Sequence, residues 1–462
     1  MTVPTHTDNH KLHFLPGTLG DVYNARLFEQ LYKDEVLWAS KYGGWFYFKE
    51  YWRLDQNDAI KLYAINIFDQ MRKRTDEIDP DIREAWRRHV KMTGGNGRLE
   101  GMMDCAKAFV GYDGEFDYNQ WLIGVKNGTV NLKTGDLYGF DPLDRISKQC
   151  MGSYKPEAKC PCWLAFIKDI LEDDLTIEYM QKAVGYALTG TTSEQCLFIL
   201  WGNGCNGKST FIETLAYVLG GYSLSCNYDT IMDKNKGTIN NDVARLKGAR
   251  FVSVAESNKS VALDEAVIKR LTGQDKIVAR FLRCENFEFY PECKIFFPTN
   301  HKPRIRGTDN GIWRRIKMIP FLKTIKPEDI DKDLPDKLKS EADGILTWAI
   351  DGCLKWQKDG LKMPMAVEEF TVRYEEEEDV IGLFLKDNCL EDKRKFIGSH
   401  EFKERLFNEL GYKISNRAVG DYMKSHGYGF DRIALEGKQA RVYLGLMWRS
   451  DDPSPSEKGW QE

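Results

Sequence analysis

The residues whose types and spacing are best suited to chemistry lie at positions 202–209, where the sequence reads GNGCNGKS. This segment fits the phosphate-binding pattern G-x-x-x-x-G-K-[ST] at every fixed position. Glycines let the backbone wrap a phosphate group so that its N–H groups point inward, while the lysine reaches the β- and γ-phosphates of a nucleotide and the serine holds Mg²⁺. The residues predicted to bind the nucleotide are Gly202, Asn203, Gly204, Cys205, Asn206, Gly207, Lys208, Ser209 and Thr210, with Ser209 also a metal ligand.

The segments on either side of this loop are those that must position it. Residues 196–201 form an apolar run that indicates a buried parallel strand. Residues 210–219 indicate a helix that stops at Gly220 and Gly221. The amino end of such a helix favours a bound anion. A chance glycine turn is the alternative, and the order of strand, loop, Lys-Ser pair and helix argues against it.

Two later strands end in polar side chains. An apolar strand from Phe251 ends at Glu256, and a second one from Lys294 ends at Asn300. A carboxylate at a strand end can polarise an attacking water or bind Mg²⁺ through water. An amide there can hydrogen-bond the γ-phosphate or position the water. Each signal is weak alone and gains weight from its place after the loop.

Two adjacent arginines, Arg314 and Arg315, follow the turn at residues 309–311. An arginine on an exposed loop can stabilise charge on the γ-phosphate of ATP bound to a neighbouring subunit. The alternative is a surface ion pair, which is the commoner role for an arbitrary pair of arginines.

Taken in order, these motifs resemble the superfamily III helicases of phages, plasmids and large DNA viruses, specifically the poxvirus-type primase-helicase family. The resemblance covers roughly residues 30–450. The matching positions in the ATPase part are 202–209, Glu256, 271–273 with Asp275 and Arg280, 298–300 with Pro303, and 313–315. The positions that resemble the family's preceding amino-terminal domain are 121–122, 127–128, 160–161, Trp163, Phe166 and 185–190.

The resemblance implies a ring, usually a hexamer, with ATP bound between subunits and 3′→5′ movement on single-stranded DNA. The residues implied to act from one subunit are Lys208, Ser209, Glu256 and Asn300, with Glu256 also near the metal, and those from the next are Arg314 or Arg315, with Arg314 preferred. It also implies a DNA-contacting hairpin before the strand that ends at Asn300. The basic residues of this hairpin are Lys276, Arg280 and Arg283, of which Arg280 has a structural role as its alternative.

Strands and helices alternate from residue 196 to 321, as in an α/β nucleotide-binding core. With the resemblance, the predicted architecture is an α/β, P-loop, AAA+-like ATPase core between a helical N-terminal accessory domain and a C-terminal winged-helix domain. Within the accessory domain, the aromatic residues at 44–52 are interpreted as core rather than as a base-stacking platform. The predicted boundaries are 1–25 for a tail, 26–190 for the accessory domain, 191–370 for the ATPase, 371–449 for the winged-helix domain and 450–462 for a disordered tail.

The carboxyl-terminal segment predicts two helices, at 400–410 and from Ser415 to about 426, followed by strands at 430–435 and 441–446. In a helix-turn-helix variant the second helix enters the major groove of DNA. The basic residues predicted to contact DNA phosphates are Arg417, Lys424, Arg432, Lys438 and Arg441. Docking of another protein is the alternative, because the acids Glu401, Glu404 and Asp421 dilute the positive charge.

Composition limits the class of protein. The net charge of −4 over 462 residues requires any DNA site to be a local basic patch. Eleven scattered cysteines suit a reducing compartment, and no apolar run is long enough to span a bilayer. Because the sequence offers no zinc-ribbon cysteines and no spare length of about 150 residues, primase activity is not expected in this chain. A cytoplasmic location is expected, in a bacterial host or at a viral replication site in a eukaryotic cell.

The sequence therefore predicts an ATP-dependent, Mg²⁺-requiring DNA helicase for replication of a phage, virus or mobile element. Its expected partners are single-stranded and forked DNA, copies of itself, and a separate primase or other replication protein. The alternatives are an ATP-regulated origin-binding or loading factor without sustained unwinding, and a small-molecule kinase.

Overall fold

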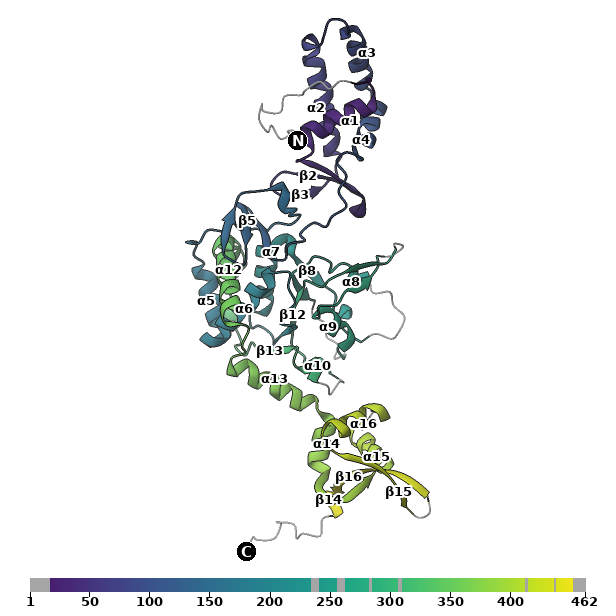
Figure 1. The fold of residues 1–462 in the computed structure, drawn as a ribbon. Helices are drawn as coiled ribbons and strands as arrows, with labels where there is room; N and C mark the ends of the chain where they lie inside the picture. The colour runs from purple at the N-terminus through teal and green to yellow at the C-terminus, as the bar shows by residue number, and fades with distance from the viewer. Residues whose placement is uncertain are drawn as a thin grey trace.

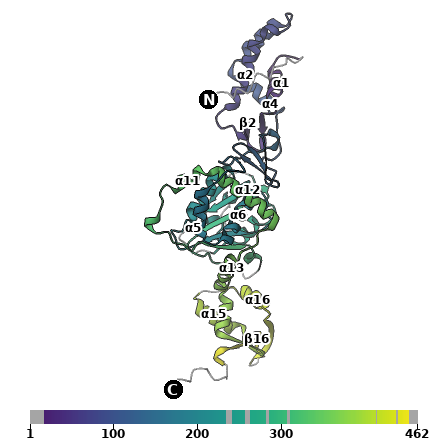
Figure 2. The same ribbon diagram turned by 90° about the vertical axis from the view of Figure 1, so that its left-hand side faces the viewer.

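The computed structural model describes residues 17–233, 241–255, 262–281, 285–305, 310–411, 414–435 and 438–451. Figure 1 shows three bodies that follow one another in chain order along a long axis, from the purple amino-terminal helices to the yellow carboxyl-terminal strands. The outline is also elongated in the view turned by 90° (Figure 2). No helix within the described ranges has both the length and the hydropathy needed to cross a bilayer.

The amino-terminal body packs four helices on a small antiparallel sheet. Its elements are α1 (Asp21–Tyr32), β1 (Val36–Ala39), β2 (Gly44–Phe48), β3 (Trp52–Leu54), α2 (Ala59–Lys73), α3 (Arg83–Thr93) and α4 (Asn96–Ala106). Each helix contributes a large apolar side chain to one core, among them Phe28, Ile67, Trp86 and Met102. Because α1 begins at Asp21, the predicted tail, which extended to residue 25, was too long.

The aromatic stretch at residues 44–52 lies in the interior of this region. Trp45 and Phe46 on β2 are buried, and Trp52 on β3 is fully buried. The Nε1 atom of Trp52 donates to the carbonyl oxygen of Pro142 at 2.9 Å. Base stacking needs an exposed ring face, so the interpretation of these residues as core is confirmed.

The central body is built on a five-stranded parallel sheet in the order β13-β7-β12-β9-β8. Its strands are β7 (Leu197–Trp201), β8 (Ser223–Cys226), β9 (Phe251–Val254), β12 (Lys294–Thr299) and β13 (Ile316–Pro320). Along β7, Phe198 and Leu200 enter one hydrophobic core while Leu197 and Ile199 enter another. This alternation is expected of a strand that is covered on both faces. The predicted mixed α/β core with a parallel sheet is therefore present.

Helices cover both faces of the sheet, and Figure 2 shows the face covered by α5, α6 and α12. The helices of that face are α5 (Pro161–Leu171), α6 (Asp174–Leu188), α7 (Lys208–Leu219), α11 (Leu334–Ser340) and α12 (Ala342–Asp359). The second face carries α8 (Asn241–Ala244), α9 (Glu265–Leu271), α10 (Asn310–Trp313) and the antiparallel hairpin of β10 (Ile277–Ala279) and β11 (Phe287–Phe289).

The division between the first two bodies falls earlier than residue 190. The meander of β4 (Leu122–Val125), β5 (Gly128–Asn131) and β6 (Asp136–Tyr138) precedes α5. One core joins Ile123 of β4, Trp163 of α5, Tyr179 of α6, Phe198 of β7 and Trp348 of α12. The predicted boundary would cut this core in two, because local periodicity does not reveal which distant surface a helix packs against.

The predicted boundary at residue 370 falls inside a helix, α13 (Met365–Glu378). This helix belongs with the central body, since the hydroxyl of Thr371 accepts a hydrogen bond from the backbone N–H of Met318 on β13 at 3.1 Å. Tyr374 is fully buried and its hydroxyl donates to the carbonyl oxygen of Pro303. The central body therefore extends to the end of α13.

The carboxyl-terminal body combines three helices with an antiparallel sheet in the order β14-β16-β15. Its elements are α14 (Val380–Asn388), β14 (Cys389–Gly398), α15 (Ser399–Leu410), α16 (Asn416–Ser425), β15 (Gly429–Leu435) and β16 (Lys438–Trp448). The hydroxyl of Ser415 accepts a hydrogen bond from the backbone N–H of Ala418, so the predicted helix cap is confirmed. The two predicted helices and two predicted strands are all present. The predicted disordered tail falls almost wholly on residues 452–462, which lie outside the described ranges.

Candidate phosphate-binding site

The glycine loop leaves the carboxyl end of β7 between two neighbouring strands. In the sheet register, Trp201 of β7 lies beside Thr299 of β12 on one side and Pro320 of β13 on the other. The next residue, Gly202, donates its N–H to the carbonyl oxygen of Thr299 at 3.3 Å. In open parallel sheets, ligands bind at the carboxyl ends of the strands, where neighbouring connections run in opposite directions. β7 is at that point, because α7 leads to the far edge strand β8 while β13 lies on its other side.

The loop requires glycine at specific positions. A Cβ atom on Gly202 would lie 2.1 Å from the carbonyl oxygen of Phe321, and one on Gly207 would lie 2.6 Å from Cγ2 of Ile170. Gly204 and Gly207 also have φ angles of +96° and +80°, which side chains disfavour. The spacing of glycines in the sequence therefore reflects the close approach of β13 and α5 as well as the turn itself.

Lys208 is almost fully buried, with 3% of its surface exposed. Its Nζ atom donates to the carbonyl oxygen of Gly202 at 2.8 Å, to Oδ1 of Asn206 at 3.0 Å and to Oδ1 of Asn300 at 2.9 Å. The Asn206 amide in turn donates to the carbonyl oxygen of Phe321 at 3.1 Å. These neutral oxygens aim the ammonium group along the loop, and charged phosphate oxygens form stronger hydrogen bonds with such a group.

The remaining loop residues fit a phosphate and a metal. Ser209 is exposed in the first turn of α7, a twelve-residue helix whose first N–H groups have no partner within the helix. Asn203 and Cys205 are exposed and Thr210 is half-buried. Backbone N–H groups, an ammonium and a hydroxyl form the set of groups that a Mg²⁺-bound triphosphate needs.

Of the two residues predicted at strand ends, the structure describes Asn300 and not Glu256. Asn300 follows β12 and contacts Lys208, although 92 positions separate them in the chain. Glu256 lies outside the described residues, and the strand before it, β9, ends at Val254 beside β12. The predicted role of Asn300 next to the loop is thus consistent with its position.

The two arginines lie at the opposite edge of the sheet. They precede β13, whose first residue, Ile316, pairs with Leu197 at the start of β7. The five residues of β7 span about 16 Å, at roughly 3.3 Å a residue. Neither Arg314 nor Arg315 can therefore reach the loop of its own chain.

Arg315 is buried, with 8% of its surface exposed. Its Nε atom donates to the hydroxyl of Thr272 at 3.1 Å, and its Nη1 atom donates to the carbonyl oxygen of Gly311. Arg314 is exposed, and its Nη2 atom donates to Oε1 of Gln195 at 2.8 Å. Arg315 is thus held by its own chain while Arg314 is exposed, so Arg314 is the better placed of the two to approach another subunit, and a catalytic role for Arg315 stays a prediction.

The hairpin predicted before β12 is formed by β10 and β11. Lys276 at its base is about half exposed and pairs with Glu288 at 3.2 Å, and Arg280 at its end is exposed. Arg283 lies outside the described residues. The predicted basic positions of the hairpin that are described therefore face solvent.

The carboxyl-terminal body carries exposed arginines on neighbouring strands. Arg432 of β15 and Arg441 of β16 are directly opposite one another in the sheet register. Like charges at such positions repel. Burial, together with the positive charge of Arg441, lowers the pKa of Lys403 on α15. Lys403 was not singled out from the sequence, because only the fold brings α15 beside β16. The concentration of positive charge favours an anionic partner at this surface.

Other predicted contacts in this body are more dispersed. Arg417 is exposed on α16 and lies 3.6 Å from Asp421 on the next turn. Lys424 is exposed at the end of α16. The side chain of Lys438 lies outside the described part of the chain. The two arginines of the hairpin β15–β16 are thus more concentrated than the cations of α16.

Comparison with known proteins relates the chain to viral replication proteins. Residues 25–172 match the family model described as D5 N terminal like, and residues 200–315 match a family of unknown function, DUF5906. "Putative helicase L207/L206" of Acanthamoeba polyphaga mimivirus is 30% identical over 326 residues, which are 64% of this chain and 34% of that protein. "Putative helicase 022R" of Frog virus 3 is 24% identical over 249 residues, which are 50% of this chain and 26% of that protein.

"Putative primase C962R" of African swine fever virus is 26% identical over 218 residues, which are 44% of this chain and 22% of that protein. The chain thus matches about a third or less of the length of these relatives. The match to the apo structure of the NrS-1 C terminal region covers 72% of this chain and 85% of that chain, at 10% identity and a TM-score of 0.42. A TM-score this low does not establish a shared fold. The sequence matches support a relationship to D5-type viral primase-helicases.

Proposed function

We propose that this chain is an ATP-dependent DNA helicase of the superfamily III type that acts in the replication of a virus, phage or mobile element. The observation that carries the proposal is the hydrogen bond from Lys208 Nζ to Asn300 Oδ1, 2.9 Å long, at the carboxyl edge of the parallel sheet. A loop lysine and a strand-end amide that meet there can hold and orient the phosphates of ATP together. The viral relatives named as helicases support a nucleic-acid substrate.

In this proposal each residue of the site has one task. When bound, Mg²⁺-ATP supplies the γ-phosphoryl group whose hydrolysis drives movement. The N–H groups of residues 202–209 surround the phosphates, and Lys208 offsets their charge. The hydroxyl of Ser209 would help to hold the metal, Asn300 would orient the γ-phosphate or the attacking water, and Glu256 would polarise that water.

The position of Arg314 indicates how copies of the chain would act together. It is exposed, and it lies about 16 Å from its own loop along β7. We therefore assign it to the γ-phosphate bound by a neighbouring copy, which requires an assembly of identical subunits, and a closed ring would complete every site in this way. The family that the chain resembles usually forms hexamers that move 3′→5′ on single-stranded DNA.

The other parts of the chain complete the proposed motor. The central body would be an AAA+-like ATPase, and the hairpin β10–β11 would follow the DNA backbone through Lys276 and Arg280. The carboxyl-terminal body would be a winged-helix module that contacts forked DNA through Arg432 and Arg441, in a salt-dependent way. A separate primase would be the replication partner.

The first test is ATP hydrolysis by the purified chain with and without single-stranded DNA. We expect DNA to stimulate hydrolysis, and Lys208→Ala to lower the rate by at least about 100-fold, since it removes a preorganised charge at the phosphates. Lys358→Ala is the matched control, because Lys358 is exposed on α12. Hydrolysis that does not respond to DNA would overturn the helicase proposal. DNA-stimulated hydrolysis without strand displacement on a fork would instead identify a loading factor.

A further inference from the structure

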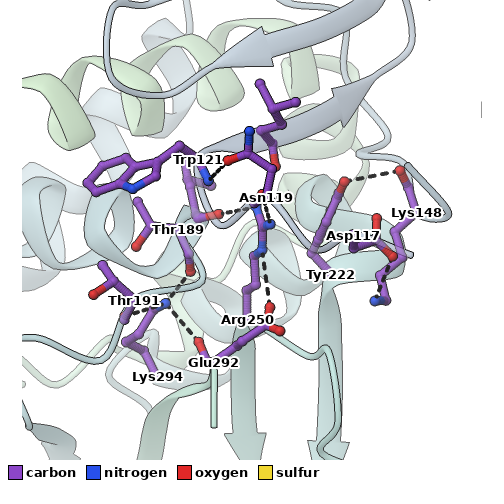
Figure 3. A network of polar contacts seen from close by, with 12 residues as sticks. Asp117, Asn119, Trp121, Lys148, Thr189, Thr191, Tyr222, Arg250, Glu292 and Lys294 are labelled. Carbon is purple, nitrogen blue, oxygen red and sulfur yellow. Dashed lines mark hydrogen bonds and ion pairs between the residues drawn. The ribbon is translucent and has the colours of Figure 1, made fainter. Parts of the chain in front are cut away.

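A network of buried polar groups lines the amino edge of the sheet, opposite the glycine loop (Figure 3). Arg250, the residue before β9, is fully buried. Its Nη1 atom donates to the carbonyl oxygens of Leu122 and Leu188, both at 2.8 Å, and its Nη2 atom donates to that of Asn119 at 3.3 Å. These carbonyls belong to the meander, to the segment just before it and to the end of α6, so Arg250 ties this region onto the sheet.

A second buried cation lies beside it. Lys294, the first residue of β12, is 1% exposed. Its Nζ atom donates to the carbonyl oxygens of Thr189, Thr191 and Glu292, the last two at 3.3 and 2.9 Å. Thr189 ends α6, and the carbonyls at the end of a helix carry partial negative charge that favours a cation. The start of β12 is thereby fixed to the end of α6.

At Glu292 the network lacks a hydrogen bond. Its Oε2 atom lies 3.9 Å from Nε of Arg250, beyond hydrogen-bond distance. Both atoms are buried, and neither has a hydrogen-bond partner in the described part of the chain. The two side chains form an ion pair at this distance, but a buried donor and acceptor that lack a hydrogen bond are unfavourable. A shift of roughly 1 Å would join them in a charge-assisted hydrogen bond. The structure shows the pair without this hydrogen bond, and a closed arrangement lies only a small shift away.

The place of Glu292 in the chain links this pair to both proposed functional sites. It lies in the connection of residues 290–293 between the hairpin strand β11 and β12. β12 is six residues, about 20 Å, and runs between β7 and β9 in the middle of the sheet. Its far end is followed by Asn300, which contacts Lys208 of the loop. A rigid strand can transmit a change at one of its ends to the other, and a contact that can close or open at one end can respond to that change.

We propose that Arg250 and Glu292 form a latch that couples the phosphate loop to the hairpin β10–β11. Occupancy of the loop changes the contact between Lys208 and Asn300, β12 transmits that change, and the latch responds by shifting between its two arrangements. Glu292 is a positioning residue in this scheme, since it touches neither nucleotide nor DNA. The inference rests on the proposed function, because the coupling it describes joins ATP to DNA.

The test measures coupling rather than rate. Affinity for a non-hydrolysable ATP analogue is measured with and without saturating single-stranded DNA, and affinity for DNA with and without the analogue. The two ratios must be equal if both report one coupling, which typically lies in the range of about 5–150-fold. The variants are Glu292→Gln, which removes the charge, and Glu292→Met, which also removes the acceptor. Glu368→Gln and Glu368→Met are the matched controls, because Glu368 is exposed on α13.

We expect the coupling ratio to fall at least threefold in Glu292→Gln and to approach one in Glu292→Met, while each affinity measured alone stays within about twofold. A purely structural role would instead move both single affinities. Burial raises the pKa of the Glu292 carboxyl, so removing its charge should not lower the melting temperature. If the Met variant fails to fold, the Gln variant decides alone.

The two proposals fail in different ways. Wild-type protein that binds analogue and DNA without coupling would refute the helicase function and the latch together. Coupling that persists unchanged in Glu292→Gln or in a folded Glu292→Met variant would refute the latch and leave the proposed function standing.

Discussion

Arg314 offers the sharpest test of how copies of this chain act together. It precedes β13 at the amino edge of the sheet, whereas Lys208 follows β7 at the carboxyl edge, about 16 Å away along the strand. An arginine side chain cannot cover that distance, so Arg314 can serve only a nucleotide bound by another copy. Loss of a trans-acting arginine lowers phosphoryl transfer by roughly 10³–10⁵-fold. Arg314→Ala should therefore be nearly inactive with its own loop intact.

The assay is DNA-stimulated ATP hydrolysis in a 1:1 mixture of Arg314→Ala and Lys208→Ala subunits. An active interface needs an intact Lys208 on one side and an intact Arg314 on the other. Random assembly supplies this combination at about one interface in four, whatever the number of subunits in a symmetric ring. If the interfaces act independently, two nearly inactive proteins should therefore recover about a quarter of wild-type activity. Arg373→Ala, an exposed arginine on α13, is the matched control.

Arg315 should respond differently. Its buried guanidinium is bonded to Thr272 and Gly311 of its own chain, so Arg315→Ala should destabilise the central body by roughly 2–4 kcal/mol. The mixture with Lys208→Ala should then show no specific recovery. The assignment of Arg314 is refuted if the mixed ring assembles, as light scattering would detect, and hydrolysis stays at the level of the separate variants.

Three further predictions concern the glycine loop, the buried Lys294 and the hairpin β15–β16 of the carboxyl-terminal body. Gly202→Ala should weaken binding of an ATP analogue at least tenfold, about 1.4 kcal/mol by calorimetry, because its Cβ would lie 2.1 Å from the carbonyl oxygen of Phe321; unchanged affinity would contradict the loop geometry. Burial and the positive charge of Arg250 lower the pKa of Lys294 from 10.5 to about 7. Above pH 7 the unfolded chain therefore binds more protons than the folded chain, so the free energy of unfolding should rise with pH. Between pH 7 and 8.5, the free energy of unfolding measured by urea denaturation should rise by up to about 1.4 kcal/mol per pH unit more in the wild type than in Lys294→Met. If the two free energies change with pH in parallel, the lowered pKa of Lys294 is disproved. Arg432→Ala and Arg441→Ala should each reduce the slope of log affinity for DNA against log salt by about 0.7–0.9, and a slope that does not change would exclude phosphate contact there.

The loop and its surroundings could be predicted because their signals are local. The pattern at residues 202–209, the apolar run before it and the helix after it are contiguous, and the structure has β7 and α7 at these positions. The cap at Ser415 is equally local, since a serine side chain and an N–H three residues on suffice. The placement of Asn300 followed from a general rule, because parallel strands bring their carboxyl ends to one edge.

The divisions between the bodies could not be predicted in the same way. The helices α5 and α6 have periodicity that would suit a separate domain, yet they share a core with the sheet. The helix α13 continues past residue 370 because Thr371 and Tyr374 bond to the central body. In each case a contact between distant residues, not a local pattern, determines the boundary.

The sequence by itself predicted the chemistry that the chain offers, since a glycine loop followed by Lys-Ser is typical of phosphate binding and its signal lies within eight residues. Only the tertiary structure showed that Arg314 and Arg315, which are adjacent in the sequence, are opposite in burial. It also decided that Arg250 forms one buried network with Glu292 and Lys294, which lie far from it in the sequence. The physical reason is that burial and pairing depend on which surfaces meet, and that is settled by long-range packing of the whole core.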